Sequence, residues 1–441
     1  MLYYLPLFGL GCLHPPEEVI EKHKDHTSSI GLVSIKTNGV VVDEMVWERP
    51  WVDVEIGITE SATKQTTTLT DPLLWSGTGA IHVRGNSSAE YEKKQYAVEI
   101  RNENGDDLAI SPFGLPVEAD WILHAPYSDK TLMRNHLMFY WSRAIGRYAP
   151  RTKFVELYME DGNGDIDESD YRGVYVFTEK IKRDPGRVNV EKLTVEDSEQ
   201  PEISGGYLLR RDWLEGDEIT TDLYEDAIAI EYPKEENITD AQRQYIEEYL
   251  NQFEDALERQ DGTYGEYINI DSFADHMLLM ELSRNVDAYV LSTYMHKPRE
   301  GKLNMGPVWD FNGSLGNADY FECWKTAGWH YENPEFPADN PNGFHWYEKL
   351  LADDTFQQKL AERWQLHRSG PWSDNQLQTD IDTNASLLAE VQQRNFERWP
   401  VLGEHIWPND FNAAERTTYE EEITYLKEWV IERAHWLDSQ L

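Results

Sequence analysis

The sequence has few cysteines, a deficit of basic residues and no long hydrophobic run. Its 441 residues include two cysteines, Cys12 and Cys323, which are too few for a disulfide framework or a zinc site. Lysine and arginine together number 40, whereas aspartate and glutamate number 81, so the formal net charge is −41. Because nucleic acids and anionic membranes attract cationic surfaces, this charge argues against nucleic acid as a partner.

Motifs of the common enzyme classes are also missing. The chain has no Walker A loop, no G-x-S-x-G elbow, no H-E-x-x-H motif and no dinucleotide-binding fingerprint. The candidates for chemistry are therefore a dispersed set of polar residues at positions that a hydrophobic core does not need.

The N-terminus holds an apolar segment that is too short to span a bilayer. Residues 1–12 resemble a lipoprotein signal in which Cys12 carries the lipid, although no lysine or arginine precedes Lys22 and Gly9 stands where an aliphatic residue is usual. A mis-assigned start codon is the alternative. We expect an extracytoplasmic, secreted or lipid-anchored protein, with residues 13–28 as a polar tether.

Hydrophobic periodicity divides the remainder into a β-rich part, residues 29–200, and a mainly helical part, residues 201–441. Apolar and polar residues alternate over 29–110, as in half-buried strands. Thr239 and Gln242 have the spacing of a helix capping box. A hairpin is expected over 153–160 and 171–181, and further helices after Tyr127, from Asp271, and over 344–367, 374–398 and 417–438. The pattern predicts an α+β protein with two lobes and a cleft between them.

A basic segment interrupts the acidic chain between residues 129 and 153. The sequence leaves two partners open for these cations: a phosphate, or the acidic remainder of the same protein. The basic residues are Lys130, Arg134, Arg143, Arg147, Arg151 and Lys153.

The first candidate for chemistry is the stretch RGNSSAEYEKKQYAVEI, residues 84–100. Its loop Gly85-Asn86-Ser87-Ser88 has small residues whose backbone amides can approach an anion. Strand alternation places Lys94 on the apolar face of the returning strand, where a lysine needs a partner. A nucleotide phosphate would serve, and the alternative is a lysine that reaches solvent at the strand end.

The second and third candidates are two aspartates at the ends of apolar segments. A helix is expected to end at Asn285-Val286-Asp287, and a short strand in GPVWDFNGSLGN is expected to end at Asp310. Phosphoryl transfer uses one carboxylate to orient a hydroxyl nucleophile and another to hold Mg²⁺. A helix C-terminal turn and a simple hairpin are the alternatives. The order of loop, lysine and two aspartates is that of a protein kinase.

Longer patterns follow one another along the chain: IHVRGNSS with KKQYAVE, WILHAPYSDKTLMRN, GVYVFTEKIKRDPGRVNV, GGYLLRRD, ELSRNVDAY and GPVWDFNGSLGN. They make the chain similar to the CotH family, the spore-coat-protein-H kinases, over roughly residues 29–400. The resemblance implies a divergent protein-kinase-like two-lobe fold, with a β-rich N-terminal lobe and a helical C-terminal lobe. It also implies transfer of the ATP γ-phosphate to Ser/Thr hydroxyls of an extracytoplasmic or surface protein, with Mg²⁺ or Mn²⁺.

The resemblance implies a role for each residue that matches these motifs. Asp287 would be the catalytic aspartate and Asp310 the metal ligand, with Asn312 and Asn285 as further metal ligands. Arg134 and Asn135 would either brace the phosphate site or be purely structural. Contacts to ATP are expected from Lys93 or Lys94, from Arg84, Gly85, Asn86, Ser87 and Ser88, and from Glu179.

Asn312 departs from the family pattern, which is commonly Trp-Asp-Phe-Asp and is Trp309-Asp310-Phe311-Asn312 here. An asparagine offers Mg²⁺ a carbonyl oxygen without negative charge. The alternative function is therefore a catalytically weak or inactive kinase-like structural or surface protein, such as a coat-assembly factor or an adhesin.

Residues 161–170, DGNGDIDESD, have oxygen ligands spaced as in a calcium loop. However, Ile166 stands where an EF-hand requires glycine, and Arg172 where it requires a bidentate glutamate. An acidic hairpin loop is the preferred interpretation.

Overall fold

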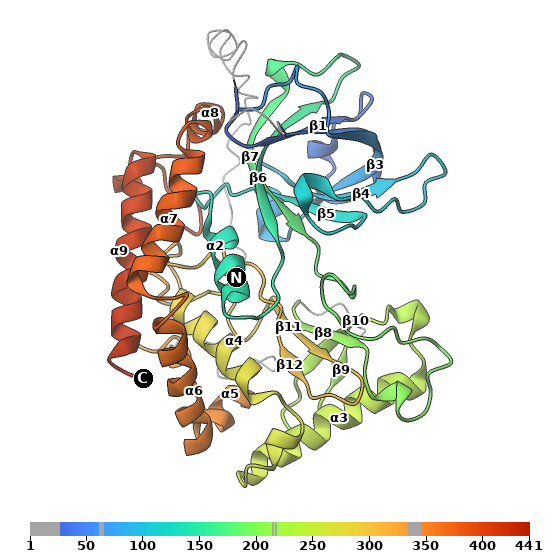
Figure 1. Ribbon diagram of the computed structural model, residues 1–441, viewed down its shortest axis with the longest axis vertical. Coiled ribbons are helices and arrows are strands. Elements are labelled where there is room, and N and C mark those ends of the chain that lie inside the picture. The colour runs from blue at the N-terminus through green and yellow to red at the C-terminus, as the bar shows by residue number, and fades with distance from the viewer. Residues whose placement is uncertain (1–26, 61–65, 214–215, 217, 334–344) are drawn as a thin grey trace, which may run out of the picture.

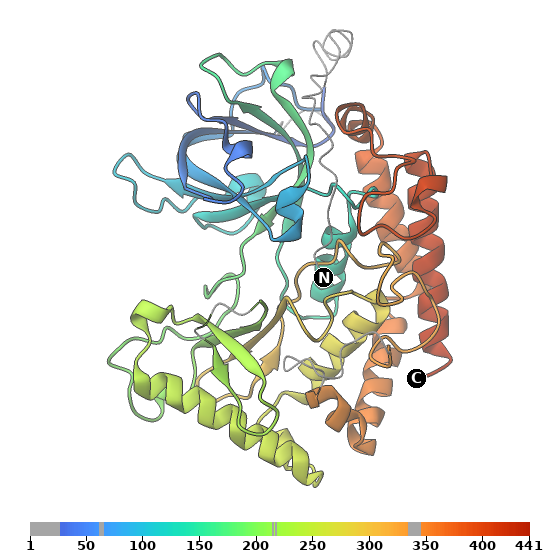
Figure 2. The same ribbon diagram turned by 180° about the vertical axis from the view of Figure 1, so that it is seen from behind.

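The computed structural model describes residues 27–60, 66–213, 216, 218–333 and 345–441, and Figures 1 and 2 show it from opposite sides. The expected lipoprotein signal over 1–12, with Cys12, and most of the tether lie outside these residues. Within the described part of the chain, no helix combines the length and the apolar character needed to cross a membrane.

Seven strands close into a barrel, which forms the upper part of Figure 1. Neighbouring strands are antiparallel except β1 and β6, which close the barrel in parallel. Alternate residues such as Val33 and Ile35 fill the interior, as the alternation over 29–110 predicts. The strands in barrel order are β1 (Gly31–Lys36), β2 (Val52–Thr59), β3 (Trp75–Arg84), β4 (Gln95–Arg101), β5 (Asp120–His124), β7 (Tyr171–Glu179) and β6 (Thr152–Glu160).

A second sheet of five strands lies below the barrel in Figure 1. Helix α3 runs along the outer side of this sheet. The strands in sheet order are β12 (Asn304–Met305), β11 (Thr293–Lys297), β8 (Tyr207–Arg211), β10 (Ala227–Tyr232) and β9 (Ile219–Thr220).

The helices gather mainly on one side of the molecule, with α9 outermost beside α7. The capping box of Thr239 and Gln242 is confirmed, whereas α4 is capped by Asn269 rather than Asp271. Two expected long helices are each divided, the first because Asp353 caps a new helix. The helices are α2 (Arg134–Ala144), α3 (Asp240–Arg259), α4 (Ile270–Ser283), α5 (His345–Leu351), α6 (Asp354–Arg368), α7 (Asp374–Leu388), α8 (Val391–Arg398) and α9 (Tyr419–Asp438).

The expectation of a divergent protein-kinase-like two-lobe fold is wrong. The N-terminal strands form a closed barrel, and the C-terminal half carries a second sheet in addition to its helices. Helix α2, which the sequence assigned to the β-rich part, packs in the same core as α4. The sequence pattern predicted the strands over 29–110 and the hairpin of β6 and β7, but it predicted neither β5 nor the long-range pairing of β1 with β6 that closes the barrel. The division at residue 200 stays a prediction.

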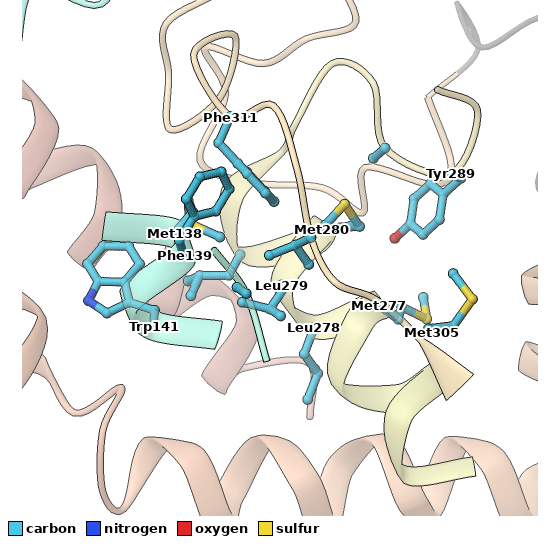
Figure 3. Close-up of a cluster of buried hydrophobic side chains, with 14 of the residues drawn as sticks. Met138, Phe139, Trp141, Met277, Leu278, Leu279, Met280, Tyr289, Met305 and Phe311 are labelled. Carbon is cyan, nitrogen blue, oxygen red and sulfur yellow. The ribbon is translucent and has the colours of Figure 1, made fainter. Parts of the chain in front are cut away.

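The largest core joins α2, α4 and the segment around Phe311, and Figure 3 shows part of it. Phe311 lies against Phe139 of α2, with ring centroids 6.3 Å apart. Phe139 also stacks on Trp309 at 5.5 Å. The core therefore anchors the residues on both sides of Asp310.

The basic segment 129–153 finds its partners mainly within the protein. Arg134 pairs with Asp129 at 2.6 Å, and Arg147 pairs with Asp275 at 2.6 Å. Arg151 binds Glu179, and Lys130 lies 3.9 Å from Glu422. Of the two open partners, the acidic remainder of the chain accounts for these four cations.

Candidate active site

Asp287 and Asp310 lie on two loops that the side chain of Asn285 ties together. The Asn285 amide donates to the backbone carbonyl of Asp310 at 2.9 Å, and its oxygen accepts the backbone N–H of Asp287 at 3.2 Å. Each of the two aspartates keeps part of its surface exposed to solvent. The strand expected to reach Asp310 ends earlier, at Met305, because the chain turns at Gly306 with φ +98°.

The backbone of Asp310 adopts the left-handed conformation, with φ +58°. A residue other than glycine pays for this conformation in stability, so surrounding contacts must hold it. Phe311 supplies two of them: its ring is buried in the core, and its N–H donates to Asn135 Oδ1 at 2.6 Å.

The carboxyl groups of Asp287 and Asp310 share a negative environment. Burial raises the pKa of Asp310 to about 6, with Arg84 acting against this shift and Asp212 adding to it. Burial, followed by the charges of Asp310 and Asp212, raises the pKa of Asp287 well above its usual range. Carboxylates that raise one another's pKa in this way favour a bound cation, which would lower both pKa values again.

A cavity of 240 Å³ opens between the outer face of the barrel and the second sheet. Arg84 and Trp309 are both in its wall, and the guanidinium lies 5.4 Å from the Trp309 ring centroid. Its mixed lining of aromatic, apolar and charged groups suits a ligand with a flat ring and an anionic end. The other lining residues are Trp51, His82, Ala97, Val98, Asp120, Trp121, Ile122, Lys180, Ile181, Glu231 and Tyr294.

The loop at residues 85–88 follows Arg84 directly and begins the connection from β3 to β4. Gly85 has φ +100°, and a Cβ there would lie 2.2 Å from Ser88 Oγ and 2.5 Å from Gln95 Nε2. Asn86 and Ser87 are exposed. Glycine is therefore required at position 85, while the next two residues are accessible to a ligand.

The two lysines expected at the nucleotide have other partners. Lys93 is buried, where its ammonium donates to the Val174 carbonyl at 2.6 Å and to Asn395 Oδ1 at 2.8 Å. Lys94 donates to the carbonyls of Ala89 and Tyr91. Strand β4 begins at Gln95, so the alternation that placed Lys94 on an apolar face does not extend to it. A phosphate contact by either lysine stays a prediction.

Glu179 is also bound within the protein. At the end of β7, its carboxylate accepts from Arg151 at 2.8 Å and 3.0 Å, from the Arg151 backbone N–H, and from the Tyr148 hydroxyl. The side chain is fully buried. These contacts account for a structural role, and its contact with ATP stays a prediction.

A divalent cation at this site would rely on few protein ligands. In the described part of the chain, no three or more His, Cys, Asp or Glu residues are grouped closely enough to hold a metal. Mg²⁺ in nucleotide sites takes one or two carboxylates and completes its shell with phosphate oxygens and water. Asp310 fits this donor set, and Asn312 beside it is partly buried, with its backbone carbonyl bound to Asn317 at 2.8 Å.

The acidic loop at residues 161–170 connects β6 and β7 as a hairpin, as expected. Its carboxylates form ion pairs with different partners: Asp161 pairs with Arg172 at 2.7 Å, and Asp165 pairs with Lys36 at 3.0 Å. Asp167 caps the short helix that follows.

Sequence reasoning missed three polar residues around the site: Asp212, whose charge acts on both aspartates, and Gln95 and His124, which lie beside Arg84. Gln95 pairs with Arg84 across β3 and β4, and His124 lies next to Gln95 on β5. Polar residues at outward positions of strand ends were the available signal, since interior positions of the barrel are apolar.

Two adjoining loops that each carry an aspartate, beside a cleft with a cation and aromatic walls, define a candidate site for an anionic ligand and a divalent metal. The family model described as CotH kinase protein matches residues 81–437. The match covers most of the chain, so the protein belongs to the CotH kinase family, as the motifs predicted. No curated protein matches the chain.

Proposed function

We propose that the protein is an ATP-dependent protein kinase that phosphorylates Ser or Thr hydroxyls of a protein outside the cytoplasm. Membership of the CotH kinase family supports a kinase-related function in general. The observation that supports the proposal most directly is the link between Asp287 and Asp310 through Asn285, beside the cleft of Arg84 and Trp309. A lipid on Cys12 would attach the protein to a membrane, which mass spectrometry of the protein isolated from its cells would check.

Each residue has a distinct role in this proposal. Asp310, with Asn312 beside it, would hold Mg²⁺ or Mn²⁺, which neutralises charge on the transferred phosphoryl group. Arg84 would contact the phosphates, with the ATP base in the aromatic cleft. Asp287 would orient the acceptor hydroxyl and accept its proton. Such catalysis is positioning and charge stabilisation, which the fixed loop geometry serves.

The test is incubation of residues 29–441 with labelled ATP and Mg²⁺ or Mn²⁺, with and without candidate acceptor proteins. We expect label on the wild type or the acceptor, and a loss of about a hundredfold or more in Asp287→Ala and Asp310→Ala. Asp165→Ala is the matched control. Asp165 is exposed in the hairpin loop between β6 and β7, and this variant should be labelled to the same extent as the wild type.

Absence of both labelling and a thermal shift with ATP and metal would contradict the proposal. The protein would then be a CotH-family structural or surface protein, for which Asn312 in place of a second carboxylate is the supporting observation. Label that persists in Asp310→Ala would instead reject the role given to Asp310.

A further inference from the structure

A continuous chain of hydrogen bonds runs from the Asp310 loop, along the outer face of the barrel, to the 85–88 loop. The Phe311 N–H donates to Asn135 Oδ1 at 2.6 Å, and the Asn135 amide contacts His124 Nε2 at 3.0 Å. His124 Nδ1 contacts Gln95 Oε1 at 3.1 Å, and the Gln95 amide donates to Ser88 Oγ at 2.5 Å. Asn135 and Gln95 are both buried.

The direction of every bond follows from the first donor. A backbone N–H can only donate, so Asn135 must present its oxygen to Phe311 and its NH₂ group to His124. His124 Nε2 must therefore accept, and Nδ1 must carry the hydrogen that is donated to Gln95 Oε1. Gln95 then has its NH₂ group directed at Ser88. Burial, with Arg84 acting in the same direction, lowers the pKa of His124 to about 3, so the ring is neutral as this arrangement requires.

The strand register brings the middle of this chain together. Arg84 pairs with Gln95 across β3 and β4, and Tyr96 pairs with Leu123 across β4 and β5. His124 follows Leu123 and therefore lies beside Gln95 on the outer face of the barrel. Gly85 leaves the space in which Ser88 and Gln95 meet.

We propose that His124 and Asn135 are positioning residues that couple the 85–88 loop to the Asp310 loop. The proposal rests on the proposed kinase function, in which the first loop approaches the nucleotide phosphates and Asp310 holds the metal. Bonds in such a chain strengthen one another, and a break leaves buried polar groups without partners. Nucleotide contact at one end and metal binding at the other are thereby linked.

The test compares two substitutions of one residue. His124→Gln provides one donor and one acceptor and preserves the direction of the chain, whereas His124→Leu provides neither. Calorimetric titration with a non-hydrolysable ATP analogue, with Mn²⁺ and with EDTA, measures how far the metal strengthens nucleotide binding. We expect His124→Leu to reduce this metal-dependent gain about tenfold, the size expected for loss of a buried hydrogen bond, and His124→Gln to retain it.

Hydrogen exchange at the Phe311 amide provides a readout that needs no ligand. We expect faster exchange in His124→Leu than in the wild type, and restored protection in His124→Gln. Thermal unfolding of each variant shows that it is folded.

Three outcomes decide the proposal. Metal dependence in His124→Leu equal to that of the wild type, or equal loss in both variants, would overturn the coupling. If the wild type binds no nucleotide, the proposed kinase function fails, and exchange at Phe311 alone decides whether the chain holds the Asp310 loop. Unchanged Phe311 exchange in His124→Leu would overturn the positioning role itself.

Discussion

Asp310 combines a left-handed backbone, a partly buried carboxyl and negative neighbours, and each of these features lowers the stability of the fold. A site that must receive a cation keeps such an arrangement, since the bound cation offsets the repulsion. Removal of the Asp310 charge should therefore raise the free energy of unfolding.

Asp310→Asn should stabilise the protein at neutral pH. The pKa of Asp310 is raised to about 6, above its unfolded value of about 4, so the folded state holds the proton more tightly. The wild type accordingly loses stability as the pH rises from about 4 to about 6, and the amide variant does not. We expect the variant to melt roughly 2 to 4 °C higher at pH 7.5.

Thermal unfolding at pH 7.5 and at pH 4 measures this effect. The difference between variant and wild type should shrink at pH 4, where both side chains are neutral. A difference that is the same at both pH values would instead reflect the tolerance of asparagine for left-handed backbone.

Helix α4 supplies the element that supports the loops of the site. Its buried Glu281 accepts the backbone N–H groups of His330 at 2.6 Å and Tyr331 at 3.0 Å, together with the Tyr289 hydroxyl at 2.8 Å. Arg433 of α9 completes the cluster at 3.1 Å. One carboxylate therefore holds the segments on either side of Asp310 in place.

Glu281→Ala should destabilise the protein by about 3 to 5 kcal/mol, because it leaves Arg433 as a buried charge without its partner. Urea unfolding monitored by tryptophan fluorescence measures the loss. Asp255→Ala, at an exposed position of α3, is the control and should leave the midpoint unchanged. A midpoint for Glu281→Ala equal to that of the control would show that the cluster is not needed for stability.

The whole molecule depends on how the barrel is attached to the helices, and α8 provides one such contact. Arg394 of α8 binds the buried Glu156 of β6 through both carboxylate oxygens, at 2.8 Å and 3.0 Å. Asn395 next to it accepts from Lys93 and from the Val174 N–H. Lys93 thus contributes to the attachment of the barrel.

Arg394→Met should cost about 3 to 5 kcal/mol and expose the 391–398 segment to protease, because the buried Glu156 carboxylate would lose the guanidinium that balances its charge. The double variant Arg394→Met with Glu156→Leu should recover much of the loss, since an apolar pair leaves no buried charge. Gln393→Ala, on the exposed side of α8, serves as the control. Urea unfolding and limited proteolysis measure both effects, and equal stability of the two Arg394 variants would contradict the argument.

The sequence by itself determined the elements and the chemical groups. Alternation over 29–110 identified β1 to β4, and the predicted hairpin identified β6 and β7. The capping box identified the start of α3, and the motifs identified the CotH family. Asp287 and Asp310 were selected because phosphoryl transfer uses one carboxylate to orient the nucleophile and another to hold Mg²⁺, and Arg84 was selected through the resemblance to the CotH family. These are local properties, which a residue and its neighbours in the chain are sufficient to specify.

Tertiary structure decided the closure of the barrel and the surroundings of each candidate. The pairing of β1 with β6 joins residues more than a hundred positions apart, so no local pattern indicates it. Strand β4 begins at Gln95, so Lys93 and Lys94 precede the strand and bind other partners. The register of β3, β4 and β5 places Gln95 and His124 in the chain of hydrogen bonds that reaches Asn135. Burial and distance set pKa values and hydrogen bonds, and both arise only when distant segments pack together.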